Sequence, residues 1–272
     1  MISENQRMEM MLANLLHRVH VLIKIIKLFK NWSKMAVYLS KNKKIVPLLE
    51  LRNGLKFYTN NNVLDVLAIV ENFEFENNHD YLRSANIPEK PNIVDVGAHI
   101  GAFSIYAATK YPHARIYSYE PDPQNYEKLI KNIELNNTQN IIPYNQAVGK
   151  TNGNVLLYSD NDGNFGTVGS SLVNRGPRSL EVSCVTLKNI LKVNEIEKCD
   201  FLKIDCEGGE YDIILNSDKD MFKEIRSIAL EYHDVTNHQA NELEIFLKNQ
   251  GYKVARFPNK RNDKYGLIYA NK

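Results

Sequence analysis

The sequence predicts an α/β domain with a mostly parallel, seven-stranded sheet that ends in an antiparallel hairpin. From residue 92 onward, short apolar segments of strand length alternate with amphipathic segments of helix length, which is the pattern of successive β-α-β units. The last two strand candidates are joined only by residues 258–264, and so short a connection requires an antiparallel pair. The third observation is a turn from Gly97 to Gly101 that leads directly from the first strand into a helix.

The expected elements follow from this alternation in chain order. Strands are expected at residues 92–96, 115–119, 141–145, 200–204, 226–232, 252–257 and 265–270. Helices are expected at residues 101–110, 123–136, 208–215 and 237–249. Residues 150–187 interrupt the pattern, and we expect two short strands there on either side of a Gly/Ser-rich loop. That loop either contributes to substrate binding, as loops at a ligand edge often do, or is a solvent-exposed connection.

Residues 1–45 are expected to form an amphipathic helical extension. Apolar residues recur at helical spacing over residues 12–29, and basic residues such as Lys24 and Lys27 fall mostly on the other side. This helix packs on the domain or on a second copy of the chain, lies on an anionic membrane surface, or covers the substrate. It carries too many charges to span a bilayer and lacks the pattern of a signal peptide.

Residues 46–90 are expected to form a hairpin and a helix that pack on a catalytic domain at residues 91–272. Asn53-Gly54 between apolar residues indicates the hairpin turn, and residues 63–72 are expected to be helical. The chain is therefore divided into a helical extension, a packed hairpin and helix, and one large α/β domain.

The composition is that of a globular protein without a strongly charged partner. Hydrophobic residues make up 43% and charged residues 24% of the 272 residues, and the formal net charge is +2. Chains that bind nucleic acid are usually more basic, so no nucleic-acid partner is expected. The three cysteines, Cys184, Cys199 and Cys206, have no CxxC spacing and indicate neither a disulfide framework nor a zinc site. A reduced, cytoplasmic setting follows, with or without contact to a membrane surface.

The turn after the first strand predicts a ligand-binding loop. Gly97 allows the backbone to turn tightly and approach a ligand, and Gly101 lets the helix begin close to the sheet. The free N–H groups at the start of that helix favour an anionic group. The glycine spacing differs from the dinucleotide pattern GxGxxG, and no Gly-Lys-Ser/Thr follows, so neither a nicotinamide cofactor nor a P-loop nucleotide is expected.

The next two strand ends predict the remainder of a nucleoside-containing ligand. Glu120 follows the second strand directly, and a carboxylate at that tip can accept both hydroxyl hydrogens of a ribose. Pro121 then ends the strand. Gln146 and the backbone near Ala147, at the end of the third strand, can hydrogen-bond the edge of an adenine, although this segment can also be an ordinary turn. A ligand with an anionic end, a ribose and an adenine is expected across the first three strands.

The fourth and fifth strand ends carry the residues expected to act on a substrate. Asp205, Glu207 and Glu210 are crowded where the fourth strand meets its helix, and such like charges need a cation, a proton or a ligand. The alternative for Glu207 and Glu210 is stabilisation of a helix N-terminus. His233 ends the fifth strand on the same side as Glu231, and it is either a base for a substrate hydroxyl or a structural histidine.

Taken together, these motifs resemble the FkbM family of S-adenosylmethionine-dependent methyltransferases. The resemblance covers residues 45–270 and rests on residues 52–57, 80–81, 95–101, 119–121, 203–210 and 231–233. It implies the class I methyltransferase, Rossmann-like fold and O-methylation of a sugar, glycan or natural-product hydroxyl. This sequence departs from the family at His99, where Asn is usual, and at Lys188, where Asp is common. Neither departure removes the expected cofactor.

On this interpretation the cofactor is S-adenosylmethionine, and proximity and alignment supply most of the rate of methyl transfer. The expected cofactor-binding residues are Asp95, Gly97, Ala98, His99, Ile100, Gly101, Glu120, Pro121, Gln146, Ala147 and Asp205. The expected catalytic residues are Asp205, Glu207 and His233. A divalent cation near Asp205 and Glu207 is compatible with the motif but not required, and no residue is assigned as a metal ligand. The alternatives are a methyltransferase that acts on RNA or another macromolecule, and a non-catalytic protein that binds S-adenosylmethionine.

Overall fold

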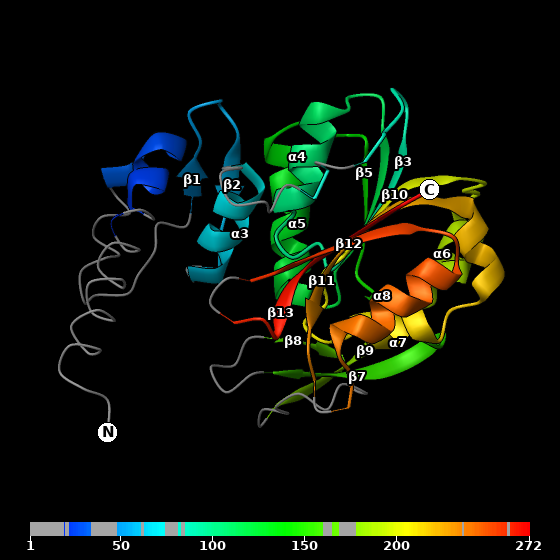
Figure 1. The fold of residues 1–272 in the computed structure, drawn as a ribbon. Helices are drawn as coiled ribbons and strands as arrows, with labels where there is room; N and C mark the ends of the chain where they lie inside the picture. Colours follow the sequence, from blue (N-terminus) through cyan, green and yellow to red (C-terminus); the bar gives the residue numbers. More distant parts are fainter. Residues whose placement is uncertain are drawn as a thin grey trace, which may run out of the picture.

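A seven-stranded sheet forms the centre of the computed structural model, which describes residues 19, 22–33, 48–60, 63–73, 81–82, 85–159, 165–168, 178–235, 237–259 and 262–272. The strand order is β12-β13-β11-β10-β3-β4-β5 (Figure 1). These strands are β3 (Asn92–Val96), β4 (Arg115–Tyr119), β5 (Ile141–Tyr144), β10 (Cys199–Ile204), β11 (Ile225–His233), β12 (Lys253–Pro258) and β13 (Tyr265–Asn271). Neighbours from β11 to β5 pair in parallel, whereas β13 pairs antiparallel with β11 and β12. The predicted sheet and its antiparallel C-terminal pair are confirmed.

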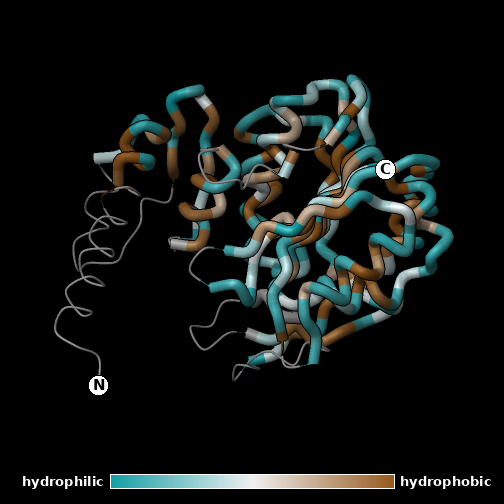
Figure 2. Tube along the Cα trace, viewed as in Figure 1, coloured by the Kyte–Doolittle hydropathy of each residue, from teal (hydrophilic) through white to brown (hydrophobic). Residues whose placement is uncertain are grey.

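Helices cover both faces of this sheet, which is why its central strands are apolar on both sides (Figure 2). Successive residues of β3 show this directly, because Ile93 packs into the core on one face and Val94 into the core on the other. One face carries α4 (Ala102–Lys110) and α5 (Pro123–Leu135). The other face carries α6 (Leu187–Val193), α7 (Glu210–Leu215), the 3₁₀ helix η2 (Lys219–Glu224) and α8 (Ala240–Asn249).

Local capping sets where several of these helices begin. Asp122 accepts a hydrogen bond from the Gln124 backbone N–H at 2.9 Å, with Pro123 in the first helical position of α5. A reciprocal capping box of Gln239 and Glu242 starts α8 at Ala240, three residues later than the sequence predicts. The sequence did not predict α6 and η2, because helices of seven and six residues are too short to show a helical period.

The insertion at residues 150–187 forms most of a second, four-stranded sheet with the order β6-β9-β7-β8. Its strands are β6 (Ala147–Val148), β7 (Gly153–Ser159), β8 (Phe165–Val168) and β9 (Ser179–Val185). The expectation of two strands is correct for β7 and β9, which pair antiparallel, and β8 is an additional strand. Most of the Gly/Ser-rich loop lies outside the described residues, so its substrate role stays a prediction.

The hairpin and helix at residues 46–90 pack on α4 and α5. The hairpin consists of β1 (Leu48–Glu50) and β2 (Lys56–Tyr58), and the helix is α3 (Val63–Phe73). The side chain of Asn132 in α5 bonds both the N–H and the C=O of Tyr58, and Asn136 bonds Lys56 in the same way. These amides satisfy the backbone of β2 in place of another strand, and so attach the hairpin to the α/β domain.

The N-terminal helix lies only partly within the described residues, and it ends at Leu28, before the end of the expected helical extension. Residues 22–28 are helical, and Phe29 then forms an antiparallel bridge with Leu51 next to the hairpin (Figure 1). The buried face also differs, because Lys24 is 5% exposed and Ile23 is 45% exposed. Most of residues 1–45 lie outside the described residues, and contact with a membrane or a second copy stays a prediction. Among the residues that are described, no helix is long and apolar enough to cross a membrane.

Candidate functional site

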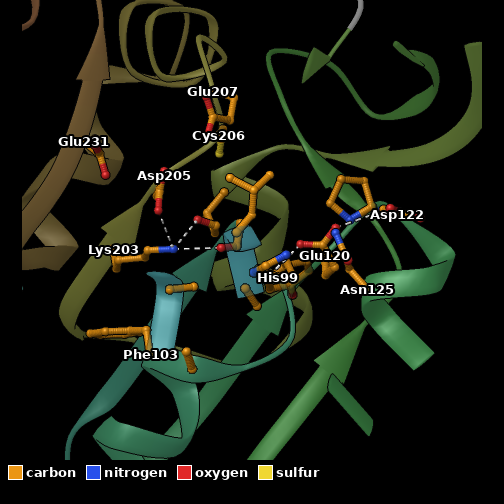
Figure 3. Close-up of a pocket in the computed structure, with 18 of the residues that line it drawn as sticks. His99, Phe103, Glu120, Asp122, Asn125, Lys203, Asp205, Cys206, Glu207 and Glu231 are labelled. Carbon is orange, nitrogen blue, oxygen red and sulfur yellow. Dashed lines mark hydrogen bonds and ion pairs between the residues drawn. The ribbon is translucent and has the colours of Figure 1, made fainter. Parts of the chain in front are cut away.

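A cavity of about 650 Å³ opens at the carboxyl ends of β3, β4 and β10 (Figure 3). This is the edge where ligands bind in open parallel sheets. The predicted site residues that line it are Gly97, Ala98, His99, Glu120, Pro121, Asp205 and Glu207. Helix α3 and Tyr81 supply a further wall. Figure 3 shows Glu120 and Asp122 at one end of the cavity, and Asp205, Glu207 and Glu231 at the other.

The turn between β3 and α4 requires glycine at two positions. The backbone of Gly97 has φ 78°, and a Cβ atom there would lie 1.8 Å from the carbonyl oxygen of Asp205. Gly101 has φ 89°, and its Cβ would lie 2.6 Å from Cδ1 of Leu129 in α5. The N–H groups of Gly97 and Ala98 both reach the carbonyl oxygen of Tyr119 at 3.0 Å. The turn is therefore held close to the ends of β4 and β10, with Gly97 exposed to the cavity.

Glu120 is held rigidly at the tip of β4. One carboxylate oxygen accepts the N–H of His99 at 2.7 Å, and the other accepts the N–H of Asp122 at 2.9 Å. Burial raises the pKa of Glu120, and the nearby charge of His99 and these two N–H donors partly oppose that shift. Each oxygen keeps a second lone pair, so the carboxylate can still accept hydrogen bonds from a ligand in the cavity.

His99 links the glycine turn to the N-terminal part of the chain. Its Nε2 lies 3.0 Å from Oδ1 of Asp65 in α3, a carboxylate with no exposed surface. Burial lowers the pKa of His99, but the hydrogen bond and charge of Asp65 raise it by more, so the net shift is upward. The departure from the usual Asn at this position thus has a structural consequence, because α3 becomes attached to the predicted cofactor loop.

Lys203 supports the glycine turn between β3 and α4, and it is the central member of a buried charge network. Its Nζ donates to the carbonyl oxygen of Gly97 at 2.7 Å and lies 3.2 Å from Asp95 and 3.5 Å from Asp205. Burial lowers the pKa of Lys203, but the charges of Asp95 and Asp205 raise it by more. The net shift is upward, so the amine stays protonated. Asp95 also accepts a hydrogen bond from the hydroxyl of Ser104 at 2.5 Å. Lys203 therefore connects β3, β10 and the glycine turn.

The acidic residues after β10, which are Asp205, Glu207 and Glu210, have two different structural roles. Glu210 is buried and accepts hydrogen bonds from the N–H groups of Cys206 and Gly208, so it holds the loop between β10 and α7 rather than facing a ligand. Asp205 faces the cavity; burial opposes its ionisation, but the charge of Lys203 prevails and holds the pKa of Asp205 below its usual value. Glu207 also lines the cavity; its side chain is largely exposed, yet desolvation of the carboxyl group raises its pKa, with the charge of His233 opposing the shift.

His233 lies behind this cluster and is not among the residues that line the cavity. Its Nδ1 is 3.3 Å from Glu210 and its Nε2 is 3.6 Å from Glu207. Burial lowers the pKa of His233, but the hydrogen bond and charge of Glu210, with Glu207 adding to them, raise the pKa to about 10. His233 is therefore an imidazolium at neutral pH. That charge state favours a role in orienting Glu207 over a role as a base.

Tyr81, Glu231 and Glu71 complete the acidic end of the cavity. The Tyr81 hydroxyl lies 3.2 Å from Oδ2 of Asp205 and 3.3 Å from Oε2 of Glu231. Loss of water around its carboxyl group raises the pKa of Glu231 to about 8, with the charge of Asp205 adding to the shift. The side chain of Glu71 reaches solvent, yet desolvation of its carboxyl end and the charge of Asp205 raise its pKa to about 7.

Several predicted site residues lie outside the cavity lining. Asp95, Ile100 and Gly101 lie beneath the turn and support it. Ala147 is 1% exposed, and the Gln146 side chain donates to the Ser183 hydroxyl at 3.1 Å. From that segment it is Val148 that lines the cavity. An adenine contact of Gln146 or Ala147 stays a prediction.

The residues at the cavity to which sequence reasoning assigned no role include Lys203, Tyr81, Glu71 and Glu231. A signal was present for Lys203, since a lysine within a buried, otherwise apolar strand needs a buried counter-charge. The signal that could have identified Glu231 was its position on the same side of β11 as His233. Tyr81 was part of the family resemblance but received no role, and no local pattern identified Glu71, because the place of both depends on how residues 46–90 pack on the domain.

No metal centre is evident in the parts of the chain that the structure describes, where no group of three or more His, Cys, Asp or Glu side chains is arranged to hold an ion. That finding neither confirms nor contradicts the prediction that the site needs no metal ion. The carboxylates at the cavity instead interact with Lys203, Tyr81 and the imidazole groups of His99 and His233.

Comparison with known proteins shows where this chain is similar to others. The profile of the family described as "Methyltransferase FkbM domain" matches residues 95–254. The chain is 26% identical over 201 residues to methyltransferase sdnD of Sordaria araneosa, covering 63% of this chain and 77% of that protein. It is 25% identical over 189 residues to methyltransferase 1 of Beauveria bassiana, covering 63% and 76%.

A solved structure supports the fold. The methyltransferase FkbM of Methylobacillus flagellatus aligns with a TM-score of 0.50 and 15% identity, covering 74% of this chain and 47% of that chain. The seven-stranded, mostly parallel sheet with its antiparallel C-terminal pair is thus that of the class I methyltransferases.

Proposed function

The chain belongs to the methyltransferase FkbM domain family, and we propose that it transfers a methyl group from S-adenosylmethionine to a hydroxyl group of a sugar, a glycan or a natural product. The observation that carries the proposal is the glycine turn at Gly97 and the fixed carboxylate of Glu120 on the wall of one cavity. A turn that admits only glycine lets a ligand contact the backbone, and a carboxylate at the tip of the second strand suits a ribose.

The residues at the cavity fit this cofactor. A volume of about 650 Å³ is within the range of small-molecule sites. The backbone of residues 97–99 at the start of α4 would hold the methionine part, Glu120 would hold the ribose, and Asp122, Asn125 and Val148 would surround the base. When bound, S-adenosylmethionine supplies a methyl group activated by a positively charged sulfur. The acidic lining favours that positive charge.

The acceptor is proposed to bind at the other end of the cavity, over Asp205 and Glu207. Asp205, ionised and fixed by Lys203, would orient the acceptor by accepting a hydrogen bond. His233 is proposed to act on the site through Glu207, which it contacts. Alignment of the two reactants in an enclosed cavity would supply most of the rate. The small net charge of +2 favours a small-molecule or glycan acceptor over nucleic acid, and we propose a cytoplasmic location.

Calorimetric titration with S-adenosylmethionine, its demethylated product and NAD tests the cofactor directly. We expect the first two to bind in the micromolar range, about −8 kcal/mol, and NAD not to bind. Binding of NAD, or of none of the three, would remove the cofactor assignment. Transfer of labelled methyl groups to a panel of sugars, glycans and hydroxylated natural products, with an RNA sample included, then tests the acceptor class. Labelling of RNA alone would refute it.

A further inference from the structure

We propose that Glu231 is the catalytic residue that takes the proton from the acceptor hydroxyl, and that Tyr81 is the residue that positions the Glu231 carboxyl group. This inference rests on the proposed function, because it assigns a role at the acceptor end of the same cavity. Glu231 comes from the end of β11 and lines the cavity beside Asp205 and Glu207 (Figure 3).

The first argument is the geometry of one hydroxyl group between two carboxylates. The Tyr81 hydroxyl is 3.2 Å from Asp205 and 3.3 Å from Glu231, but it has only one hydrogen to donate. If both carboxylates were ionised, one of them would face an oxygen lone pair without a hydrogen. If one carboxylic acid carries a proton, it can donate to the Tyr81 oxygen while Tyr81 donates to the other carboxylate. The arrangement is therefore complete when the two acids share one proton.

The second argument decides which of the two acids carries that proton. Asp205 has Lys203 at 3.5 Å, and this ammonium stabilises the ionised form. Glu231 has no Lys, Arg or His within ion-pair distance among the residues that the structure describes. Asp205 is therefore the ionised partner, and Glu231 is the partner that gains and loses the proton. Tyr81 itself stays protonated, because burial raises its pKa well above its ordinary value.

The surroundings of Glu231 give it the proton affinity that a base needs near neutral pH. The groups that face it are Asp205 and Glu207 after β10, Glu71 in α3, Tyr81, and His233 on its own strand. Desolvation, together with the charges of Asp205, Glu71 and Glu207, raises the pKa of Glu231 to about 8 against the opposing charge of His233. A general base works best when its pKa is close to the working pH. Asp205, with a lowered pKa, is a much weaker proton acceptor.

The transfer balances with Glu231 as the proton acceptor. The acceptor oxygen forms a bond to the methyl carbon while the bond from that carbon to sulfur breaks, and the electron pair stays on sulfur. The hydroxyl proton passes to the ionised carboxylate of Glu231, which then donates a hydrogen bond to the Tyr81 oxygen and releases the proton to water. No oxidant, reductant or metal ion enters this balance.

Carboxyl titration by NMR on the full chain labelled with ¹³C at the glutamate side chains tests the shared proton without any acceptor. We expect one glutamate to titrate at about 8 and to be absent in Glu231→Gln. The matched control is Glu71→Gln, which should remove the titration at about 7 and retain the one at about 8, shifted slightly down. Tyr81→Phe should shift the midpoint of the Glu231 carboxyl titration. A Glu231 that titrates between about 4 and 5, like an ordinary glutamate, would overturn the proposal.

Two further readouts separate this inference from the proposed function. Calorimetry with the demethylated product should give Glu231→Gln the wild-type affinity; a loss as large as that of Glu120→Ala would make Glu231 a cofactor residue and overturn the proposal. With the acceptor found in the panel, the wild-type rate should rise with pH through about 8. Glu231→Gln should lack that rise and be about 10²- to 10⁴-fold slower. If wild type binds no cofactor, the proposed function fails, while the titration still reports the shared proton.

Discussion

The buried ammonium of Lys203 leads to a stability prediction whose size follows from the structure. Lys203 is 3% exposed, and its Nζ lies 3.2 Å from the fully buried Asp95 and donates to Gly97. Lys203→Met removes the cation but retains an apolar chain of similar length, so Asp95 is left in the core with the Ser104 hydroxyl as its one side-chain donor among the described residues. Removing one member of a buried ion pair destabilises a protein by about 3–5 kcal/mol. We expect a loss of that size in the free energy of unfolding.

Urea unfolding followed by circular dichroism measures this loss, with an unchanged slope showing that the unfolded state is comparable. The matched control is Lys188→Met, which breaks the 2.6 Å pair with Asp218 on the surface, where both side chains are exposed. Exposed pairs contribute little, so this variant should unfold with wild-type stability. Equal stabilities for the Lys203 and Lys188 variants would refute the view that Lys203 holds β3, β10 and the glycine turn together.

Three further predictions concern the cofactor loop. Glu120→Ala should weaken binding of S-adenosylmethionine about 10- to 100-fold in calorimetry, through lost charge-assisted hydrogen bonds; unchanged affinity would remove the ribose assignment. Gly97→Ala should abolish that binding and lower the melting temperature, because its Cβ would meet the Asp205 carbonyl oxygen, and wild-type behaviour in both assays would contradict this. The pKa of His99 is raised in the folded state, so the stability from its pair with Asp65 is complete below about 6.5 and is lost as pH rises through the folded pKa. His99→Asn should therefore destabilise the protein more at pH 6 than at pH 9 in urea unfolding, and equal losses would show that the pair does not titrate.

The sequence predicted the sheet well because its signals are local. Alternating strands and helices, and the short connection at residues 258–264, determine a parallel sheet with an antiparallel end almost without reference to tertiary contacts. The residues at strand ends were predicted for the same reason. In a parallel sheet the carboxyl ends of neighbouring strands share one edge, so Gly97, Glu120 and Asp205 had to lie close together once the strands were placed.

The roles of individual side chains were harder to predict, since they depend on which way each residue points and what it meets. Glu210 and Glu207 are close in sequence, yet Glu210 bonds the loop before α7 and Glu207 faces the cavity. His233 was a candidate base by position, but two glutamates beside it make it a cation. Gln146 was expected at the adenine, which stays a prediction, and its side chain donates to the hydroxyl of Ser183 in β9. None of these differences changes the hydrophobic pattern from which the sequence was interpreted.

One wall of the cavity comes from residues that the family profile does not reach. The profile matches residues 95–254, which contain the glycine turn, Glu120 and the acids after β10. Glu71 and Tyr81 come from the hairpin-and-helix segment before it, and Asp65 in the same segment attaches α3 to His99. The cofactor is proposed to bind within the matched region, whereas residues before that region complete the acceptor end of the cavity. Acceptor specificity is therefore expected to change with substitutions in α3 and at Tyr81, and affinity for the cofactor with substitutions at Gly97 and Glu120.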